Sequence, residues 1–394
     1  MRVAMLTREY PPEVYGGAGV HVEYLARELA RLEEVTVHCW GDDRPEGGGP
    51  PAVGYRAWEA LDGREPHRPA LQAVSIDLAM AVGVEGAELV HSHTWYANLA
   101  GHLARLLYEI PHVATVHSLE PLRPWKAEQL GGGYALSSFC ERTALEAADA
   151  IVAVSQGMRR DVLAVYPAID PDRVEVIYNG VDTAEYRPDA QTDVLERYGI
   201  DPEQPSVVFV GRITRQKGVP YLLEAARAFD AEAQLVLCAG APDTPEIGAE
   251  VERRVASLRA ERGNVTWIDE MLPKRDVIQL LSHAHVFVCP SIYEPLGIVN
   301  LEAMACEAPV VATATGGIVE VVDDGVTGLL VPYEPQDPAG FAVGIAARVN
   351  VLLRDPDRAR AMGRAGRERA LERFAWPAIA EQTSALYHAA RERL

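Results

Sequence analysis

Two successive series of short apolar runs, each interleaved with amphipathic helical stretches, constrain the fold of this chain most strongly. The first series comprises RVAML (2–6), VTVHCW (35–40), AELVHS (87–92), HVATVH (112–117), AIVAVS (150–155) and VEVIYN (174–179). The second comprises SVVFVGR (206–212), QLVLCAG (234–240), NVTWID (264–269), VFVCPS (286–291), PVVATA (309–314) and GLLVP (328–332). Strands that are apolar on both faces and alternate with helices form parallel sheets covered on both sides. The sequence therefore predicts an α/β protein with two doubly wound, Rossmann-like domains.

The polar, turn-rich segment NGVDTAEYRPDAQTD (179–193) separates the two series. We expect an N-terminal domain over 1–188, a C-terminal domain over 189–375 and a closing helix over 376–394 that crosses back to the first domain. The length of 394 residues fits this division, because domains typically hold about 100–150 residues. Ligands of open α/β sheets bind beyond the carboxyl ends of the strands. The segments that follow strands are therefore the places to search for a site.

The charge balance limits the possible partners. The formal net charge of -20 argues against nucleic acid and against an anionic membrane surface. Any bound anion must then be held by a local cluster of positive charge. The five scattered cysteines form no CxxC pair, which disfavours a zinc or redox site and indicates a reducing compartment. The opening MRVAMLTREY reads as a strand rather than a leader, so we expect a cytoplasmic protein.

The first strand is followed by the glycine-rich stretch TREYPPEVYGGAGVH. Gly16, Gly17 and Gly19 stand just before a helix, where glycine lets backbone N–H groups approach an anion at the helix N-terminus. The dinucleotide fingerprint GxGxxG fails, because Val22 stands where its third glycine would be. This disfavours a nicotinamide dehydrogenase. The alternative for the stretch is a plain loop with tight helix packing.

The first strand of the second domain leads into GRITRQKG (211–218). Arg212 and Lys217 flank a turn, and the chain contains only three lysines. The arginine fork and the lysine point charge can together hold a diphosphate. The alternative is a solvated basic loop.

The stretch SIYEPLGIVNLEAMAC (291–306) is a strand exit followed by a helix. The N–H groups of Gly297, Ile298 and Val299 have no partner inside that helix and favour a phosphate. Glu294 before the helix and Glu302 within it can each accept hydrogen bonds from a diol, a sugar on one side and a ribose on the other. The alternatives are an ordinary loop carboxylate and an ordinary helix-face carboxylate.

Histidines also stand at strand ends. His117 closes HVATVH and either serves a structural role or hydrogen-bonds a sugar hydroxyl or reacting group. His91 and His93 have the look of a metal pair, but no adjacent Asp/Glu cluster completes a site, so no metal is expected.

The loop HSLEPLRPWKAEQ carries Ser118, Arg123 and Lys126. In a chain this acidic, a cation pair beside a cleft suggests a small anionic acceptor. The alternative is that the two cations pair with Glu120 and Glu128 on a solvated loop.

Taken in order, EYPPEVYGGAGVH, ATVHS, NGVD, VGRITRQKG and EPLGIVNLEAMAC…PVVATATGGIVEVVDDGVTGLLVP span almost the whole chain. They resemble the retaining GT-B glycosyltransferases of family 4, close to glycogen synthases, and the block from 291 to 332 is the most specific part. The segment HSLEPLRPWKAEQLGGGY (117–134) is similar to the actinobacterial type of glycogen synthase.

The resemblance implies roles for the residues singled out above. The donor diphosphate would be held by Arg212 and Lys217, the transferred sugar by Glu294 and His117, and the nucleotide ribose by Glu302. Backbone groups of Gly297 to Val299 would bond the sugar and phosphate, and the Gly16–Gly19 loop would close over the donor. Many glycogen synthases have a lysine before two glycines, whereas Tyr15 precedes Gly16 here. More of the anion binding therefore falls to the second domain.

The resemblance also implies a retaining, metal-independent glucosyltransferase without a cofactor. It would move glucose from a nucleotide sugar, ADP-glucose, to glucose 1-phosphate or an α-glucan, forming an α-1,4 link and, with the phosphorylated acceptor, α-maltose 1-phosphate. A glycogen synthase that extends the glucan directly and a nucleotide-sugar 2-epimerase on the same fold are the alternatives. A lipid acceptor is disfavoured by the net charge and the lack of a basic amphipathic helix. The sequence leaves the nucleotide base and the oligomeric state, including a homodimer, open.

Overall fold

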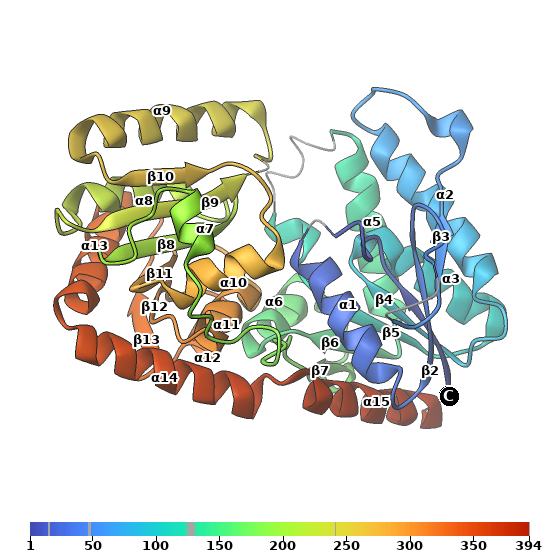
Figure 1. Ribbon diagram of the computed structural model, residues 1–394. Coiled ribbons are helices and arrows are strands. Elements are labelled where there is room, and N and C mark those ends of the chain that lie inside the picture. Colours follow the sequence, from blue (N-terminus) through green and yellow to red (C-terminus); the bar gives the residue numbers. More distant parts are fainter. Residues whose placement is uncertain (15, 46–48, 124–130, 241, 394) are drawn as a thin grey trace. The chain divides into compact units, whose positions relative to one another are not determined.

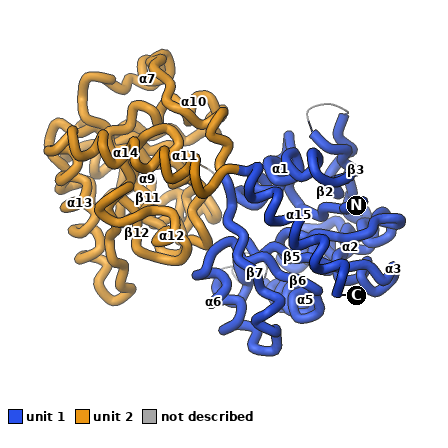
Figure 2. Tube along the Cα trace, turned by 90° about the horizontal axis from the view of Figure 1, so that it is seen from below, with its two compact units in different colours: residues 1–180, 376–394 blue, residues 181–375 orange. Residues whose placement is uncertain are grey.

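The computed structural model describes residues 1–14, 16–45, 49–123, 131–240 and 242–393, which form two compact units (Figures 1 and 2). Unit 1 comprises Met1–Gly180 and Trp376–Leu394, and unit 2 comprises Val181–Ala375. The boundary therefore falls at Val181 and not at residue 189, because the connecting segment bonds within unit 2. The backbone N–H of Val181 donates to the carbonyl of Phe374 at 2.9 Å.

Unit 1 is built on a seven-stranded sheet in the order β3-β2-β1-β4-β5-β6-β7, and all of its pairings are parallel. The six strands expected from the sequence are present, and their interiors are mostly buried, except that Glu175 in the middle of β7 is exposed. The strand missed is β3, a short, half-exposed edge strand that contains a glycine. The strands are β1 Arg2–Leu6, β2 Glu34–Trp40, β3 Ala52–Tyr55, β4 Leu89–His93, β5 His112–Val116, β6 Ala150–Ala153 and β7 Val174–Val176.

Helices cover both faces of this sheet, as Figure 1 shows. One core joins the sheet to α1 and α15 and includes Leu25 and Tyr387, while another joins it to α2 and α3 and includes Met80 and Ala100. Burial on both faces explains why the strands read as continuous apolar runs. The helices of unit 1 are α1 Gly17–Leu29, α2 Arg68–Gly83, α3 Trp95–Tyr108, α5 Gly133–Ala147, α6 Gln156–Val165 and α15 Trp376–Glu392.

The last helix, α15, packs within unit 1 although it follows unit 2 in the chain. The ring of Trp376 stacks on Tyr24 of α1 with a centroid distance of 5.9 Å, and the Tyr387 hydroxyl lies 2.6 Å from Nδ1 of His91. The buried positions of α15 recur every three or four residues, which places them on one face of the helix.

Unit 2 is built on a six-stranded parallel sheet in the order β10-β9-β8-β11-β12-β13. Its strands match the second apolar series: β8 Ser206–Arg212, β9 Gln234–Gly240, β10 Val265–Ile268, β11 Val286–Cys289, β12 Val310–Thr313 and β13 Gly328–Val331. Its helices are α7 Asp193–Arg197, α8 Val219–Ala225, α9 Pro245–Arg262, α10 Lys274–Ser282, α11 Ile298–Ala305, α12 Ile318–Val321, α13 Pro338–Arg354 and α14 Pro356–Arg373.

The strand order reverses between β1 and β4 in unit 1 and between β8 and β11 in unit 2. Such a switch point leaves a crevice beyond the carboxyl ends of the two strands, where ligands of this architecture bind. The loops that follow these four strands are therefore the first places to examine.

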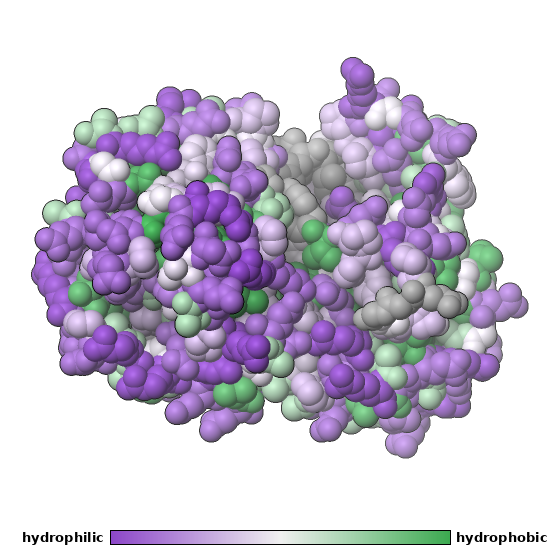
Figure 3. Space-filling view, in the orientation of Figure 1, coloured by the Kyte–Doolittle hydropathy of each residue, from purple (hydrophilic) through white to green (hydrophobic). Residues whose placement is uncertain are grey.

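The molecular surface in Figure 3 is mostly hydrophilic, with hydrophobic side chains scattered over the face shown. Among the described residues, no helix combines the length and the apolar character needed to cross a bilayer.

Candidate active site

The switch point of unit 2 holds an ion pair between two residues singled out in the sequence. Nζ of Lys217, in the loop after β8, lies 2.7 Å from Oε2 of Glu294, in the loop after β11. Burial alone would lower the pKa of Lys217, but the adjacent Glu294 carboxylate outweighs it and raises that pKa. The lysine is therefore a fixed positive charge at neutral pH. It carries that charge to the crevice where a ligand of this sheet would bind.

Backbone packing brings the two loops together. Gly218 has a φ of +66°, and a Cβ added there would lie 2.0 Å from the carbonyl oxygen of Pro290, so only glycine fits. One residue back from the lysine, the carbonyl of Gln216 accepts a hydrogen bond of 2.9 Å from the N–H of Ile292. Because β8 and β11 are neighbours in the sheet, these contacts hold Lys217 against Glu294.

Arg212 ends β8 and is oriented by a carboxylate of its own. Its Nη1 lies 3.1 Å from Oδ1 of Asp243, in the loop after β9. Arg212 also acts electrostatically on Lys217. The structure thus brings together the two cations expected to hold a diphosphate.

The helix expected after Glu294 is α11, and it begins at Ile298. Gly297 caps it with a φ of +96°, and a Cβ there would lie 2.6 Å from Nδ2 of Asn300. Asn300 is fully buried, and neither of its side-chain amide atoms has a hydrogen-bond partner among the described residues. An unpartnered buried amide in the first turn of a helix is a candidate ligand contact. The sequence analysis missed it because an asparagine in an apolar helix reads as incidental.

Two glycines after β12 lie against the loop that carries Glu294. The sequence analysis named them only within the longer motif that ends at residue 332. Gly316 has a φ of +51°, and a Cβ there would lie 2.0 Å from the carbonyl oxygen of Glu294. The N–H of Gly317 donates to that carbonyl at 3.0 Å. The glycine pair, TGG in the sequence, therefore fixes the backbone that carries Glu294.

Glu302 lies one turn further along α11 and is partly buried. Burial raises the pKa of its carboxyl, while a hydrogen bond from Tyr186 and the charges of Lys274 and Lys217 oppose that rise. Glu294 and Glu302 thus have different hydrogen-bond partners, Lys217 and Tyr186, as expected for two carboxylates that do not share a proton.

In unit 1, the glycine-rich loop after β1 forms a hydrogen bond with the carboxylate of Glu9. Oε2 of Glu9 accepts a hydrogen bond of 2.7 Å from the N–H of Gly16, which caps α1. A Cβ on Gly19 would lie 2.8 Å from that side chain, so glycine is needed there for close packing. Gly17 opens the helix itself. A protein carboxylate thus occupies the helix N-terminus where an anion was expected, and a donor-binding role for the loop stays a prediction.

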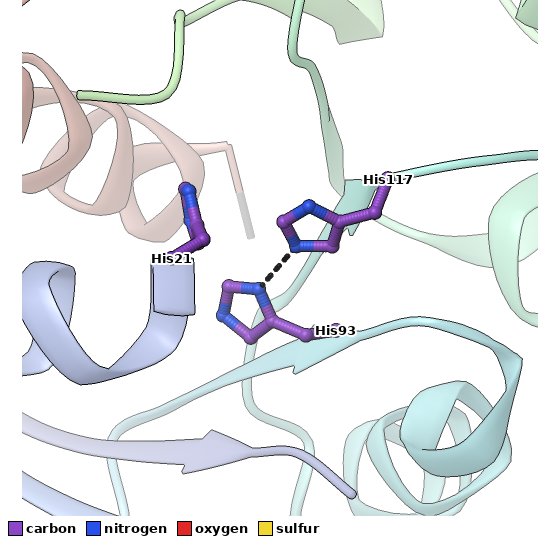
Figure 4. Close-up of side chains that lie close together, drawn as sticks. All are labelled: His21, His93 and His117. Carbon is purple, nitrogen blue, oxygen red and sulfur yellow. Dashed lines mark hydrogen bonds between the residues drawn. The ribbon is translucent and has the colours of Figure 1, made fainter. Parts of the chain in front are cut away.

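His117 follows β5 and belongs to a cluster of three imidazoles (Figure 4). Nδ1 of His93 lies 3.1 Å from Nε2 of His117, and the ring of His21 lies 4.7 Å from that of His117. Burial lowers the pKa of His21 to about 4 and holds those of His93 and His117 well below the usual value. All three rings are therefore neutral at pH 7 and can donate or accept a hydrogen bond to a hydroxyl group. His21 was missed, because it is separated from the other two by a long stretch of sequence.

The histidine pair His91 and His93 is not a metal pair. Nδ1 of His91 bonds Tyr387 and its Nε2 bonds Thr115 at 2.7 Å, so both nitrogens of this ring are occupied. The nitrogens of His21, His93 and His117 do lie within 4.8 Å of one another. In a tetrahedral zinc site the bonds of about 2.0–2.1 Å bring ligand nitrogens closer than that. These three side chains are the group among the described residues whose ligand atoms lie close enough together to be a candidate metal site.

The proposed acceptor loop is described only in part. Lys126 lies outside the described residues. The guanidinium of Arg123 forms an ion pair with Glu120, the pairing given by the alternative for this arginine, but the Glu120 carboxylate is fully buried and not solvated. Oε2 of Glu120 also accepts a hydrogen bond of 2.8 Å from Ser137. Ser118 is partly buried beside His117. Arg123 is thus already neutralised, while its role toward an acceptor is untested.

One switch point carries a Lys–Glu pair, an adjacent arginine and a helix N-terminus bounded by glycines. Together with the two doubly wound units, these features define a glycosyltransferase of the GT-B fold. Two family models match the chain: Glycosyltransferase Family 4 over residues 15–185, and Glycosyl transferases group 1 over residues 191–369. The chain belongs to the family 4 glycosyltransferases and is a hexosyltransferase.

Individual relatives match over the full length. The chain is 58% identical to the alpha-maltose-1-phosphate synthase of Mycolicibacterium smegmatis, over 98% of this chain and 99% of that protein. It is 55% identical to the protein of the same name from Mycobacterium tuberculosis, with the same coverage. Among solved structures, the sucrose-phosphate synthase of Thermosynechococcus elongatus superposes with a TM-score of 0.82 and 26% identity over all of both chains. A nucleotide-sugar donor and a sugar acceptor are consistent with these relatives.

Proposed function

We propose that this chain transfers glucose from ADP-glucose to α-D-glucose 1-phosphate, forming the α-1,4 link of α-maltose 1-phosphate for α-glucan biosynthesis in the cytoplasm. The observation that carries the proposal is the 58% identity, over 98% of the chain, to an alpha-maltose-1-phosphate synthase. The acceptor loop with Ser118, Arg123 and Lys126 is the part of the sequence that suggests a phosphorylated acceptor.

The proposed chemistry retains the anomeric configuration. The departing diphosphate takes the proton of the acceptor hydroxyl, so no protein carboxylate acts as the base. Lys217 and Arg212 stabilise the negative charge that grows on the leaving group, and Glu294 orients the transferred glucose. His117, held neutral by its surroundings, accepts or donates a hydrogen bond to a glucose hydroxyl. No metal is required in this scheme, because the two cations supply the positive charge.

The alternative is a glycogen synthase that extends the glucan directly. The discriminating experiment supplies ADP-glucose with glucose 1-phosphate or with glycogen, and repeats each reaction with UDP- and GDP-glucose. We expect α-maltose 1-phosphate from ADP-glucose and glucose 1-phosphate, with slower extension of glycogen. Ready extension of glycogen without any phosphorylated disaccharide would instead establish the glycogen synthase. Donor turnover without an acceptor would point to the 2-epimerase.

A further inference from the structure

We infer that Arg8 forms an anion subsite of unit 1 that binds the phosphate of the acceptor sugar. The inference rests on the proposed function for the identity of that acceptor. Arg8 stands directly after β1, at the switch point of the sheet, where β1 and β4 are neighbours. This edge is where ligands of doubly wound sheets bind.

Two aromatic rings hold the guanidinium in place. The Cζ atom of Arg8 lies 5.1 Å from the ring centroid of Trp40, which ends β2, and 4.3 Å from that of Tyr96, in the first turn of α3 after β4. The backbone carbonyl of Arg8 also accepts a hydrogen bond of 3.3 Å from the N–H of Trp40. Residues at the carboxyl ends of three adjacent strands therefore fix one cation.

This mode of support leaves the binding capacity of the arginine intact. Contacts with aromatic rings use none of the guanidinium's conventional hydrogen-bond partners, and its N–H groups match two oxygens of a phosphate. Arg8 is exposed to solvent, and none of the described residues forms an ion pair with it. An arginine that serves only stability is normally paired with a carboxylate or with backbone carbonyls, as Arg173 is with the carbonyl of Ala148 at 2.7 Å.

The nearby carboxylates are engaged elsewhere. Glu9 and Glu120 both act electrostatically on the Tyr96 hydroxyl, as do Arg8 and Arg123. Glu9 accepts the hydrogen bond from Gly16, and Glu120 is bonded to Arg123 and Ser137. The positive charge of Arg8 is thus the one in this group without a matching protein carboxylate. In a chain of net charge -20, such a cation selects an anion locally.

The test compares Arg8→Met, which keeps the length of the side chain against the rings, with Arg8→Lys, which keeps the charge. Arg2→Met is the matched control, because Arg2 lies at the opposite end of the same strand and pairs with Glu88 on the surface. We expect Arg8→Met to raise the KM for glucose 1-phosphate about 10- to 100-fold, the loss of a charge-assisted hydrogen bond. The KM for ADP-glucose and the rate with maltose, a neutral acceptor, should stay at the wild-type values. Arg8→Lys should recover part of the loss, and Arg2→Met should show none.

Three results would overturn the inference. An unchanged KM for glucose 1-phosphate in a folded Arg8→Met variant would remove Arg8 from the acceptor subsite. An equal rise in KM for maltose would show that Arg8 supports the structure and not the phosphate. Direct calorimetry separates this failure from failure of the proposed function. If the wild-type protein makes no α-maltose 1-phosphate, the wild type and Arg8→Met are each titrated with glucose 1-phosphate and with inorganic phosphate. Equal affinity of the two proteins for these ligands refutes the subsite.

Discussion

Nζ of Lys217 lies 2.7 Å from Oε2 of Glu294, although 77 residues separate them in the chain. The pair joins the residue proposed to hold the donor diphosphate to the residue proposed to hold the transferred sugar. A salt bridge this deep loses part of its charges' hydration, and removal of one partner leaves the other uncompensated. The two side chains are therefore electrostatically coupled, because removal of either charge leaves the other without its partner.

Replacing Lys217 by alanine should lower kcat/KM more than it weakens binding of ADP-glucose, because the lysine charge matters most when charge grows on the leaving group. A charge-assisted hydrogen bond is worth roughly 1.5–3 kcal/mol, so kcat/KM should fall about 10- to 150-fold. Steady-state kinetics measure the fall. Arg215→Ala, an exposed arginine of the same loop, is the control and should retain activity. Wild-type kinetics in a folded Lys217→Ala protein would remove the lysine from the site.

Substitutions of Glu294 and Glu302 should affect different kinetic quantities. Glu302→Gln should weaken the affinity for ADP by about 10-fold, since a charged acceptor of the ribose hydroxyls is lost. Glu294→Gln should mainly reduce kcat and leave ADP affinity near the wild-type value. Isothermal calorimetry with ADP and steady-state kinetics test both, with Glu252→Gln on the exposed face of α9 as the control. Unaltered ADP affinity in Glu302→Gln would show the ribose assignment to be wrong.

Gly316→Ala should impair turnover by displacing the backbone of Glu294. The added Cβ would meet the Glu294 carbonyl oxygen at 2.0 Å, and the φ of +51° adds strain. We expect a loss of stability of about 1–3 kcal/mol, the usual cost of overpacking, together with a lower kcat. Gly325→Ala is matched for strain, since its φ is +81°, but its Cβ would meet no atom within 4 Å. If both variants lose activity equally, strain and not displacement of Glu294 is responsible. Thermal unfolding and kinetics provide the two readouts.

Glu141→Gln should flatten the dependence of stability on pH. Burial raises the pKa of the Glu141 carboxyl from 4.5 to about 8 in the folded protein. The folded state therefore holds this proton while the unfolded state releases it. The contribution of protonated Glu141 to the free energy of unfolding is fully present below pH 4.5. It falls as the pH rises from 4.5 to about 8 and is gone above about 8. The steepest fall is about 1.4 kcal/mol per pH unit for one proton.

Urea unfolding at pH 5, 6, 7 and 8 measures this effect as the difference between the wild type and Glu141→Gln. Tyr166 donates to Oε1 of Glu141 at 2.6 Å, and glutamine retains an oxygen for that bond. The variant should therefore fold. A difference that is constant with pH would mean that Glu141 ionises in the folded protein as it does in the unfolded chain.

Local patterns predicted much of the fold. The first strand of unit 2 shows where they succeed, and the first loop of unit 1 shows where they fail. Runs such as SVVFVGR announce a buried strand because period and composition are properties of neighbouring residues. The glycines after β1 were recognised as a close approach of the backbone that favours an anion, and in the structure the carboxylate of Glu9, which the sequence did not point to, bonds there. Its hydrogen bond to Gly16 spans only seven residues, yet it depends on a turn whose geometry no periodic pattern encodes.

The sequence by itself determined two doubly wound units, twelve of the thirteen strands found among the described residues, and the strand-end loops that carry Arg212, Lys217, Glu294 and His117. The tertiary structure alone decided which of these loops meet. Strand order in each sheet departs from chain order at β1–β4 and at β8–β11, and this reordering joins Lys217 to Glu294 and Arg8 to Tyr96. It also brought His21 to His93 and His117. Such contacts arise from the packing of whole strands and helices, and a chain read residue by residue holds no local signal of them.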